Sequence, residues 1–303
     1  DVFFQTPPTE GGVDLDPWFA ELDLAALTER TFAGLGLEVA SILSRSDLEP
    51  REGKSQHAFC TDVGRSGDVR VLSNNAPTAE WAATMLHEFG HAVYDRGIGS
   101  TLPWGLRTVH PVVTEGVAMM FEALVHEPRW LTTIAGLDPA LVERMTPLLA
   151  AQRRAGELVT VRWVLVMTNF ERQLYADPDG DHDVRWWDLV EHFQLLTRPD
   201  DRRAADWASK IHIASAPVYY HNYLLGDLVA LQLRDAIDRS HGGLVDSLDA
   251  GRFLSEAIFA LARTVGWIAQ LNEMVADEEY KIGRPRQLFM GSPAREVPSI
   301  EKR

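Results

Sequence analysis

Apolar residues recur every three or four positions along most of the chain, which is the period of a helix with one buried face. The first such stretch runs from Pro17 to about Ser46, with an interruption at Gly34 and Gly36. The same pattern predicts further helices over residues 77–96, 111–126, 138–176, 184–197, 218–239, 251–264 and 266–279. We therefore expect a mostly α-helical protein.

One segment departs from the helical pattern. Residues 56–62 and 68–73 favour strands, and Gly64-Arg65-Ser66-Gly67 between them is typical of a hairpin turn. The hairpin precedes the helix predicted over 77–96, so we expect a small sheet beside that helix.

The two ends of the chain differ from its middle. Proline and glycine pairs near the start cannot sustain a helix, so residues 1–16 are predicted to form an extended arm. The helical pattern is lost near the other end, where residues 283–303 are predicted to form a loose tail. No repeat or clear linker divides residues 17–282, which we expect to form one helical domain.

The amino-acid composition limits the classes of molecule that we expect this protein to bind. The 303 residues include 29 Lys and Arg against 44 Asp and Glu, a net charge of −15. This charge repels phosphate backbones and anionic headgroups, so we expect neither nucleic acid nor a membrane as partner. Cys60 is the only cysteine, which excludes a disulfide framework and a cysteine-rich zinc site. We find no membrane span and no signal segment, and we expect a cytoplasmic location.

The strongest chemical signal is the run His87-Glu88-Phe89-Gly90-His91 in the helix predicted over 77–96. Two histidines four residues apart share a helix face, so both imidazoles can bind one metal ion. The glutamate points about 100° round the helix, where it can hold a metal-bound water instead of binding the ion. The pattern predicts a site for one zinc ion, with His87 and His91 as ligands and Glu88 as general base.

A catalytic zinc site also needs a third protein ligand and an open fourth position. The candidates are His110, Glu115 and Glu122. His110 precedes Pro111 at a predicted helix start, where we expect it to cap the helix. Glu115 stands on an otherwise apolar helix, where a buried carboxylate needs a compensating cation, so we favour it as the ligand. Glu122, two turns further on, suits a hydrogen bond to a ligand histidine.

The order of several motifs resembles a known family. His57-Ala58-Phe59-Cys60, then His87 to His91, then Thr114-Glu115-Gly116 follow one another as in the gluzincin-type zinc peptidases related to angiotensin-converting enzyme and thimet oligopeptidase. Further on, Lys210-Ile211-His212-Ile213 with Tyr220 and Tyr223 resembles the family's Lys-x-His segment and tyrosine pair. The resemblance covers most of residues 54–240.

This resemblance implies a zincin-like catalytic domain and suggests a role for each matching residue. His87, His91 and Glu115 would bind zinc, which lowers the pKa of a bound water to about 7 and polarises the scissile carbonyl. Glu88 would take the proton of that water and pass it to the leaving amine.

The remaining matches imply contacts with a peptide substrate. Tyr223 and His212 would stabilise the oxyanion, which is typically worth about 3 kcal/mol for each donor. Lys210 and Tyr220 would hold the C-terminal carboxylate of the peptide, and the strand at His57-Ala58 would pair with its backbone.

Several positions depart from the family pattern. The Lys-x-His segment lies one residue further from the tyrosines, which leaves Tyr219 as a rival for Tyr220. Asn222 replaces a chloride-binding arginine, so chloride activation is not implied. Met119 replaces the aspartate that orients a ligand histidine, a role that we assign to Glu122.

The largest departure is length. Only 86 residues precede His87, where the family builds one wall of its cleft from a long helical region. We expect this chain to be the C-terminal catalytic portion of a two-lobed cleft, completed by a second chain or an N-terminal fragment. The expected activity is that of a zinc metallopeptidase acting on short peptides, as an oligopeptidase or peptidyl-dipeptidase. The alternatives are a non-catalytic zinc-containing module that binds peptides or proteins, and a zinc hydrolase of non-peptide amides.

Overall fold

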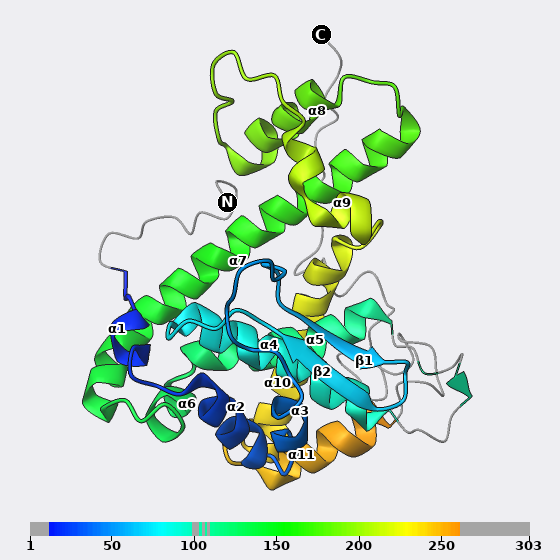
Figure 1. Cartoon of the computed structure of the whole chain (residues 1–303). Helices are drawn as coiled ribbons and strands as arrows, with labels where there is room; N and C mark the ends of the chain where they lie inside the picture. The colour runs from blue at the N-terminus through cyan, green and yellow to red at the C-terminus, as the bar shows by residue number, and fades with distance from the viewer. Residues whose placement is uncertain (1–11, 99–102, 105–106, 108–109, 261–303) are drawn as a thin grey trace, which may run out of the picture.

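The computed structural model describes residues 12–98, 103–104, 107 and 110–260, and these are mostly helical (Figure 1). The helices are α1 (Asp16–Phe19), α2 (Leu24–Ala33), α3 (Ala40–Leu43), α4 (Ala79–Gly97), α5 (Pro111–Glu122), α6 (Pro128–Thr133), α7 (Pro139–Ala176), α8 (His182–Leu189), α9 (Ile211–Ser215), α10 (His221–His241) and α11 (Leu248–Phe253). Short 3-10 or π turns are η2 (Ala123–His126), η3 (Val190–Gln194), η4 (Asp206–Ser209) and η5 (Leu254–Phe259). Strands β1 (Phe59–Val63) and β2 (Asp68–Leu72) form one antiparallel hairpin, so the prediction of a mostly α protein with a small hairpin is confirmed.

Helices α4 and α7 begin at capping side chains. The Thr78 hydroxyl accepts a hydrogen bond from the backbone N–H of Trp81 and caps α4 (3.2 Å). Asp138 accepts from the N–H of Leu141 and caps α7 (2.9 Å). Both helices therefore start within two residues of the positions that the pattern predicts.

The helical stretch predicted from Pro17 to about Ser46 forms three short helices, α1 to α3, and the interruption predicted at Gly34 and Gly36 separates α2 from α3. Asp23 accepts hydrogen bonds from the N–H groups of Ala25 and Ala26, which starts a new helix after α1. Gly36 has a φ of 72°, a left-handed conformation that ends the next one. The apolar residues keep helical spacing throughout this stretch, but the cap at Asp23 and the left-handed Gly36 divide it into separate helices.

Two later helices also differ from their predictions. The helix predicted over 184–197 begins at His182, continues as the π turn η3 and ends before Leu195, whose φ is 58°. The helix predicted over 218–239 begins only at His221, because Val218 has a φ of 57° and cannot be helical.

Some predictions concern the ends of the chain. Residues 12–15 lack regular structure, as expected for the end of the predicted arm, and α1 begins at Asp16. The helix predicted over 251–264 begins three residues early as α11 and continues as η5, and its residues 261–264 lie outside the described residues. The helix predicted over 266–279 and the tail over 283–303 lie outside the described residues.

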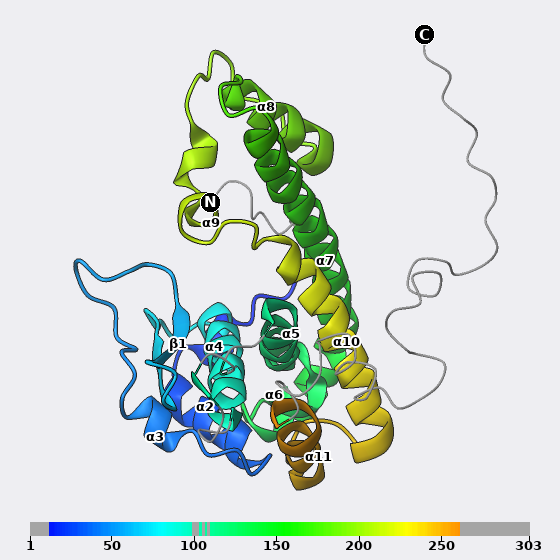
Figure 2. The same cartoon turned by 90° about the vertical axis from the view of Figure 1, so that its right-hand side faces the viewer.

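Apolar side chains pack into two cores. The main core includes Phe89 of α4, Phe121 of α5 and Leu233 of α10. The smaller core lies further along α7, where Trp163 packs against Trp186 of α8. Figure 2 shows α7 rising out of the main body, with α8 against its far end. Within the described residues, no helix has the length and apolar content needed to cross a membrane.

Helix α5 lies between α4 and α10 and contacts both of them extensively. Two glycines allow this close approach. A Cβ atom at Gly90 of α4 would lie 2.8 Å from the Cα of Ala118, and one at Gly226 of α10 would lie 2.7 Å from the Cβ of Glu115. Helix α5 is therefore fixed from two sides at the level of Glu115.

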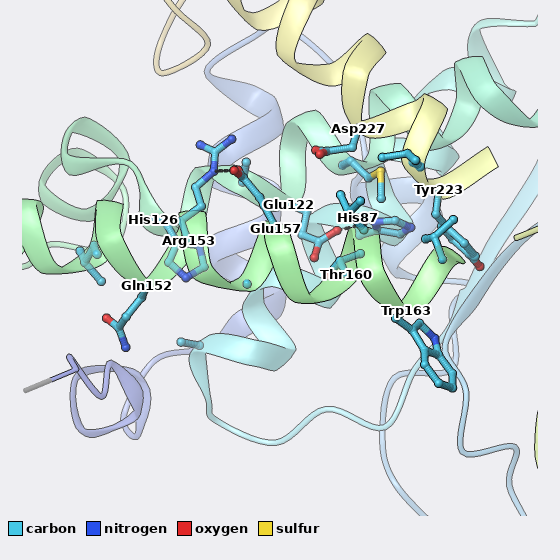
Figure 3. Close-up of a pocket in the computed structure, with 18 of the residues that line it drawn as sticks. His87, Glu122, His126, Gln152, Arg153, Glu157, Thr160, Trp163, Tyr223 and Asp227 are labelled. Carbon is cyan, nitrogen blue, oxygen red and sulfur yellow. Dashed lines mark hydrogen bonds and ion pairs between the residues drawn. The ribbon is translucent and has the colours of Figure 1, made fainter. Parts of the chain in front are cut away.

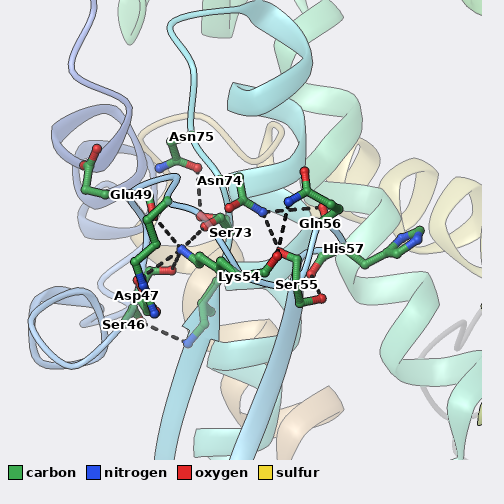
Figure 4. Close-up of polar contacts among 12 residues, drawn as sticks. Ser46, Asp47, Glu49, Lys54, Ser55, Gln56, His57, Ser73, Asn74 and Asn75 are labelled. Carbon is green, nitrogen blue, oxygen red and sulfur yellow. Dashed lines mark hydrogen bonds and ion pairs between the residues drawn. The ribbon is translucent and has the colours of Figure 1, made fainter.

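The loop before the hairpin is anchored by a buried lysine (Figure 4). The side chain of Lys54 is only 1% exposed, and its ammonium group donates to the carbonyls of Asp47, Glu49 and Ser73 and to the Asp47 carboxylate. The Asn74 amide donates to the carbonyl of Ser55 (2.8 Å). These bonds hold the segment that leads into β1 against the end of β2.

Candidate metal centre and substrate cleft

Helix α4 presents two imidazoles on one face. The Nε2 atoms of His87 and His91 lie 3.2 Å apart, and the two rings meet edge to face with their centroids 4.8 Å apart. Both side chains are partly buried, at 17% and 14% exposure. The four-residue spacing therefore brings two nitrogen ligands to one point, as the helix geometry requires.

Glu115 of α5 completes a triangle with these nitrogens. Its Oε2 atom lies 3.6 Å from Nε2 of His87 and 3.8 Å from Nε2 of His91. Ligand atoms that sit about 2.0–2.2 Å from a tetrahedral ion lie about 3.3–3.6 Å from one another. The three separations are therefore close to those of a site around one small cation.

The environment of Glu115 also fits a cation. Its side chain is 4% exposed, and among the described residues its Oε2 atom has no hydrogen-bond partner. A buried and unsatisfied carboxylate oxygen is costly unless a positive charge faces it. Two nitrogens and one oxygen form a ligand set that suits zinc. In the part of the chain that the structure describes, His87, His91 and Glu115 are the one group of this kind.

Each candidate ligand is held by a second side chain. Nδ1 of His87 contacts Oε2 of Glu122 at 2.8 Å, which is the contact expected for Glu122. Nδ1 of His91 contacts the hydroxyl of Thr114 at 2.7 Å. Such partners fix which ring nitrogen faces a metal. The sequence reasoning quoted Thr114 only as a family match, although its position next to Glu115 placed it within reach of the site.

The remaining candidate for the third ligand, His110, lies at the N-cap of α5. Its Nδ1 atom accepts from the backbone N–H of Val112 at 3.3 Å. This is the capping role that the sequence predicts, and it places His110 outside the triangle.

Burial and neighbouring charges set the protonation of the two histidines. Burial lowers the pKa of His87, but the hydrogen bond to Glu122 and the nearby carboxylates outweigh it and raise the pKa to about 9. Burial, together with the adjacent His87, lowers the pKa of His91, whose ring is therefore neutral. A metal ion at this site has to displace the proton of His87, so its affinity depends on pH.

Glu88 lies on the same helix, one position after His87, and is 7% exposed. Burial raises its pKa to about 7, although a hydrogen bond from the backbone of Cys60 in β1 opposes the shift. A carboxylate with a pKa near 7 can take up and release a proton at neutral pH. This is the behaviour required of a general base.

A second polar cluster is formed by α9 and the start of α10. Nε2 of His212 contacts the hydroxyl of Tyr223 at 3.0 Å. The ring of Tyr220 packs edge-on against both, with centroid distances of 4.7 and 5.1 Å. The structure thus brings together the two residues to which the family resemblance gives the oxyanion role.

Lys210 and Tyr220 meet around one tryptophan. The Tyr220 hydroxyl accepts a hydrogen bond from the indole of Trp163 (2.7 Å), and the Lys210 ammonium lies 5.3 Å from the centroid of the same ring. Tyr219, the rival of Tyr220, points elsewhere, because its hydroxyl donates to Oε1 of Glu115 at 2.5 Å. The sequence reasoning missed this contact, for which the sequence carries no local signal.

One cavity of about 780 Å³ connects the two clusters. Its lining includes His87 and Glu122 from the first cluster, His212, Tyr220 and Tyr223 from the second, and also His57. Figure 3 shows the cavity running along α7 from Trp163 towards Arg153 and Glu157, with Asp227 also in its lining. Arg153 and Glu157 form an ion pair (2.8 Å). The cavity is large enough for several residues of a peptide.

His57 and Ala58 do not lie in a strand, so the prediction that the strand begins at residue 56 is wrong. Strand β1 begins at Phe59, which pairs with Leu72 at the end of β2. Ser73, the residue after β2, accepts a hydrogen bond from Lys54 with its carbonyl and donates its N–H to the carbonyl of Asp47, so both of its backbone groups are engaged away from residue 58. His57 still lines the cavity from the loop before β1.

Comparison with known protein families finds no family model that the chain matches.

Proposed function

We propose that the chain is a zinc-dependent metallopeptidase with a zincin-like site, which hydrolyses short oligopeptides in the cavity along α7. The observation that carries the proposal is the triangle of His87, His91 and Glu115, with Glu88 beside it on the same helix. Zinc bound there would polarise the scissile carbonyl and acidify a water molecule. The side chains around the triangle suit the remaining steps.

Glu88 is the proposed general base. Its buried carboxylate accepts the proton of the attacking water and delivers it to the leaving amine, for which a pKa of about 7 is well matched. Because Glu88 is adjacent to His87 in sequence but turned round the helix, it acts beside the ligands and not as one of them.

Tyr223 and His212 are the proposed oxyanion donors. Burial lowers the pKa of His212, so its ring is neutral. If Nε2–H of His212 donates to the Tyr223 oxygen, 3.0 Å away, the Tyr223 proton is free to point at the substrate. This pair then stabilises the negative charge that develops on the carbonyl oxygen.

Lys210 and Tyr220 are proposed to bind the C-terminal carboxylate of the peptide. Tyr220 uses its oxygen to accept from Trp163, so its own proton remains available to a carboxylate. Lys210, over the same indole, adds a positive charge. His57 and Ala58 would contact the peptide backbone from the loop before β1. A second chain or N-terminal fragment that completes the cleft, and a cytoplasmic location, stay predictions.

The test compares the wild type with Glu88→Gln and with Glu80→Gln, an exposed glutamate in the first turn of the same helix. We expect about one zinc ion per chain in all three proteins by elemental analysis. We expect cleavage of a mixed-sequence decapeptide by the wild type and Glu80→Gln, and a loss of at least about 100-fold in Glu88→Gln. Wild-type protein that binds no zinc would contradict the proposal.

Two other outcomes identify the alternatives. A wild type that carries zinc but leaves a peptide library intact would point to the non-catalytic binding module. Hydrolysis of simple amides without cleavage of peptides would point to the zinc hydrolase of non-peptide amides.

A further inference from the structure

Glu115 has two carboxylate oxygens in different situations. Oε1 accepts a hydrogen bond from the Tyr219 hydroxyl at 2.5 Å, whereas Oε2 faces the Nε2 atoms of His87 and His91. A carboxylate that is free to rotate can offer either oxygen, or both, to a cation. The contact with Tyr219 commits one oxygen and leaves the other directed at the two imidazoles.

The partner of Glu115 comes from a different part of the molecule than the partners of the histidines. Glu122 and Thr114, which hold His87 and His91, are both on α5. Tyr219 instead lies 104 positions after Glu115, in the segment that precedes α10. Its contact therefore ties Glu115 to the segment that leads into α10, the helix that carries Tyr223.

The backbone before Tyr219 is held in a strained conformation. Val218 has a φ of 57°, which is unfavourable for a β-branched residue, and its side chain is 60% exposed. Packing of the side chain therefore does not explain the conformation. The backbone N–H of Val218 donates to Oε1 of Glu171 on α7 at 2.6 Å, and Glu171 is itself buried. The structure thus holds a strained turn immediately before the residue that contacts Glu115.

We propose that Tyr219 is a positioning residue for Glu115, held in place by the Val218–Glu171 contact, and that it makes Glu115 a one-oxygen ligand to the metal. This inference rests on the zinc site of the proposed function, and it adds a residue that acts through Glu115 and not on the substrate. The site then has one partner for each ligand: Glu122 for His87, Thr114 for His91 and Tyr219 for Glu115.

The test uses Tyr219→Phe and, as matched control, Tyr223→Phe, which removes a hydroxyl from a tyrosine that packs against Tyr219 (centroids 5.4 Å apart) but does not contact Glu115 in the structure. Zinc affinity is measured by competition with a chromophoric chelator. We expect Tyr219→Phe to weaken binding by about 10–100-fold and Tyr223→Phe to stay within about threefold of the wild type.

Cobalt(II) in place of zinc gives a second readout that a loss of stability would not produce. In Tyr219→Phe the released Oε1 is free to join Oε2 at the metal, so we expect the visible d–d bands to shift and weaken as the coordination number rises. The bands of Tyr223→Phe should match those of the wild type. Identical cobalt spectra and zinc affinities within threefold for Tyr219→Phe would overturn the inference.

Glu171→Ala tests the contact that holds the turn before Tyr219, and it keeps the inference testable if Tyr219→Phe does not fold. It removes the acceptor of the Val218 N–H, whereas Glu171→Gln keeps an acceptor oxygen. We expect zinc affinity to fall about tenfold in the alanine variant and to be retained in the glutamine variant. Equal affinity in the two variants would count against the role of the strained turn.

The two proposals fail in different ways. Wild-type protein that binds no zinc overturns both the proposed function and the role of Tyr219. Wild-type protein that binds zinc and cleaves peptides, with Tyr219→Phe equal to it in affinity and cobalt spectrum, overturns the role of Tyr219 alone.

Discussion

Replacing Gly226 by alanine should separate α10 from α5 at the level of the metal triangle. The added Cβ would lie 2.7 Å from the Cβ of Glu115 and 3.2 Å from the backbone nitrogen of Gly116. Comfortable contacts between carbon atoms are about 3.5–4.0 Å, so the overlap with Glu115 is about 1 Å. The atoms that clash belong to a helix backbone and a Cβ, which cannot rotate away.

Helix α5 also cannot move away from α10, because α4 packs against its opposite side. Gly90 leaves no room there, since even a Cβ at that position would lie 2.8 Å from Ala118. Overpacking of this kind costs about 1–3 kcal/mol. The better helix propensity of alanine returns up to about 1 kcal/mol. We therefore expect Gly226→Ala to lower the free energy of unfolding by up to about 2 kcal/mol and, by displacing Glu115, to weaken zinc binding.

Gly156 of α7 provides the matched control. It is also inside a helix, but a Cβ there would meet no atom within 4 Å. Gly156→Ala should raise the free energy of unfolding by about 0.5–1 kcal/mol and leave zinc affinity unchanged. Urea unfolding of the zinc-free proteins and chelator competition measure the two quantities. If Gly226→Ala is as stable as Gly156→Ala and binds zinc equally well, the argument from close helix packing is refuted.

The rate of peptide cleavage should fall on the acid side of neutrality. Burial raises the pKa of Glu88 to about 7, and a general base must be ionised, so activity is lost as the pH falls through that pKa. A bound cation favours the charged carboxylate and therefore moves the acid limb of the pH profile below pH 7. A flat profile of kcat/KM between pH 5 and 8 would contradict this role. Lys54→Met should lower the free energy of unfolding by about 3 kcal/mol, because it strips buried donors from the carbonyls of Asp47, Glu49 and Ser73. A loss of less than about 1 kcal/mol in urea unfolding would show that these contacts contribute little.

Features that depend on nearby residues were predictable from the sequence. The helices α4 and α7 follow from periodicity and from the caps at Thr78 and Asp138, and the hairpin follows from its glycine turn. The same is true within the candidate site, where the proximity of His87 and His91 is a property of one helix. The spacing within a single helix also places Glu122 on the same face as Glu115.

Features that depend on distant partners were not predictable. The start of β1 at Phe59 follows from Ser73, whose backbone groups bond to Lys54 and Asp47. The late start of α10 depends on Val218, whose conformation is held by Glu171 of another helix. Periodicity cannot report either contact, because both join segments far apart in the sequence. The contact between Tyr219 and Glu115 was missed for the same reason.

The division of apolar side chains into two cores has a consequence for how the molecule would lose activity on heating. The metal triangle stands on helices of the main core, whereas Tyr220 belongs to the smaller core, against which Tyr223 packs. If the smaller core melts first, the helices that carry His87, His91 and Glu115 stay folded, but the residues proposed to bind the peptide lose their places and the hold of Glu171 on the turn before Tyr219 is lost. Inactivation and weaker zinc binding would then both precede global denaturation.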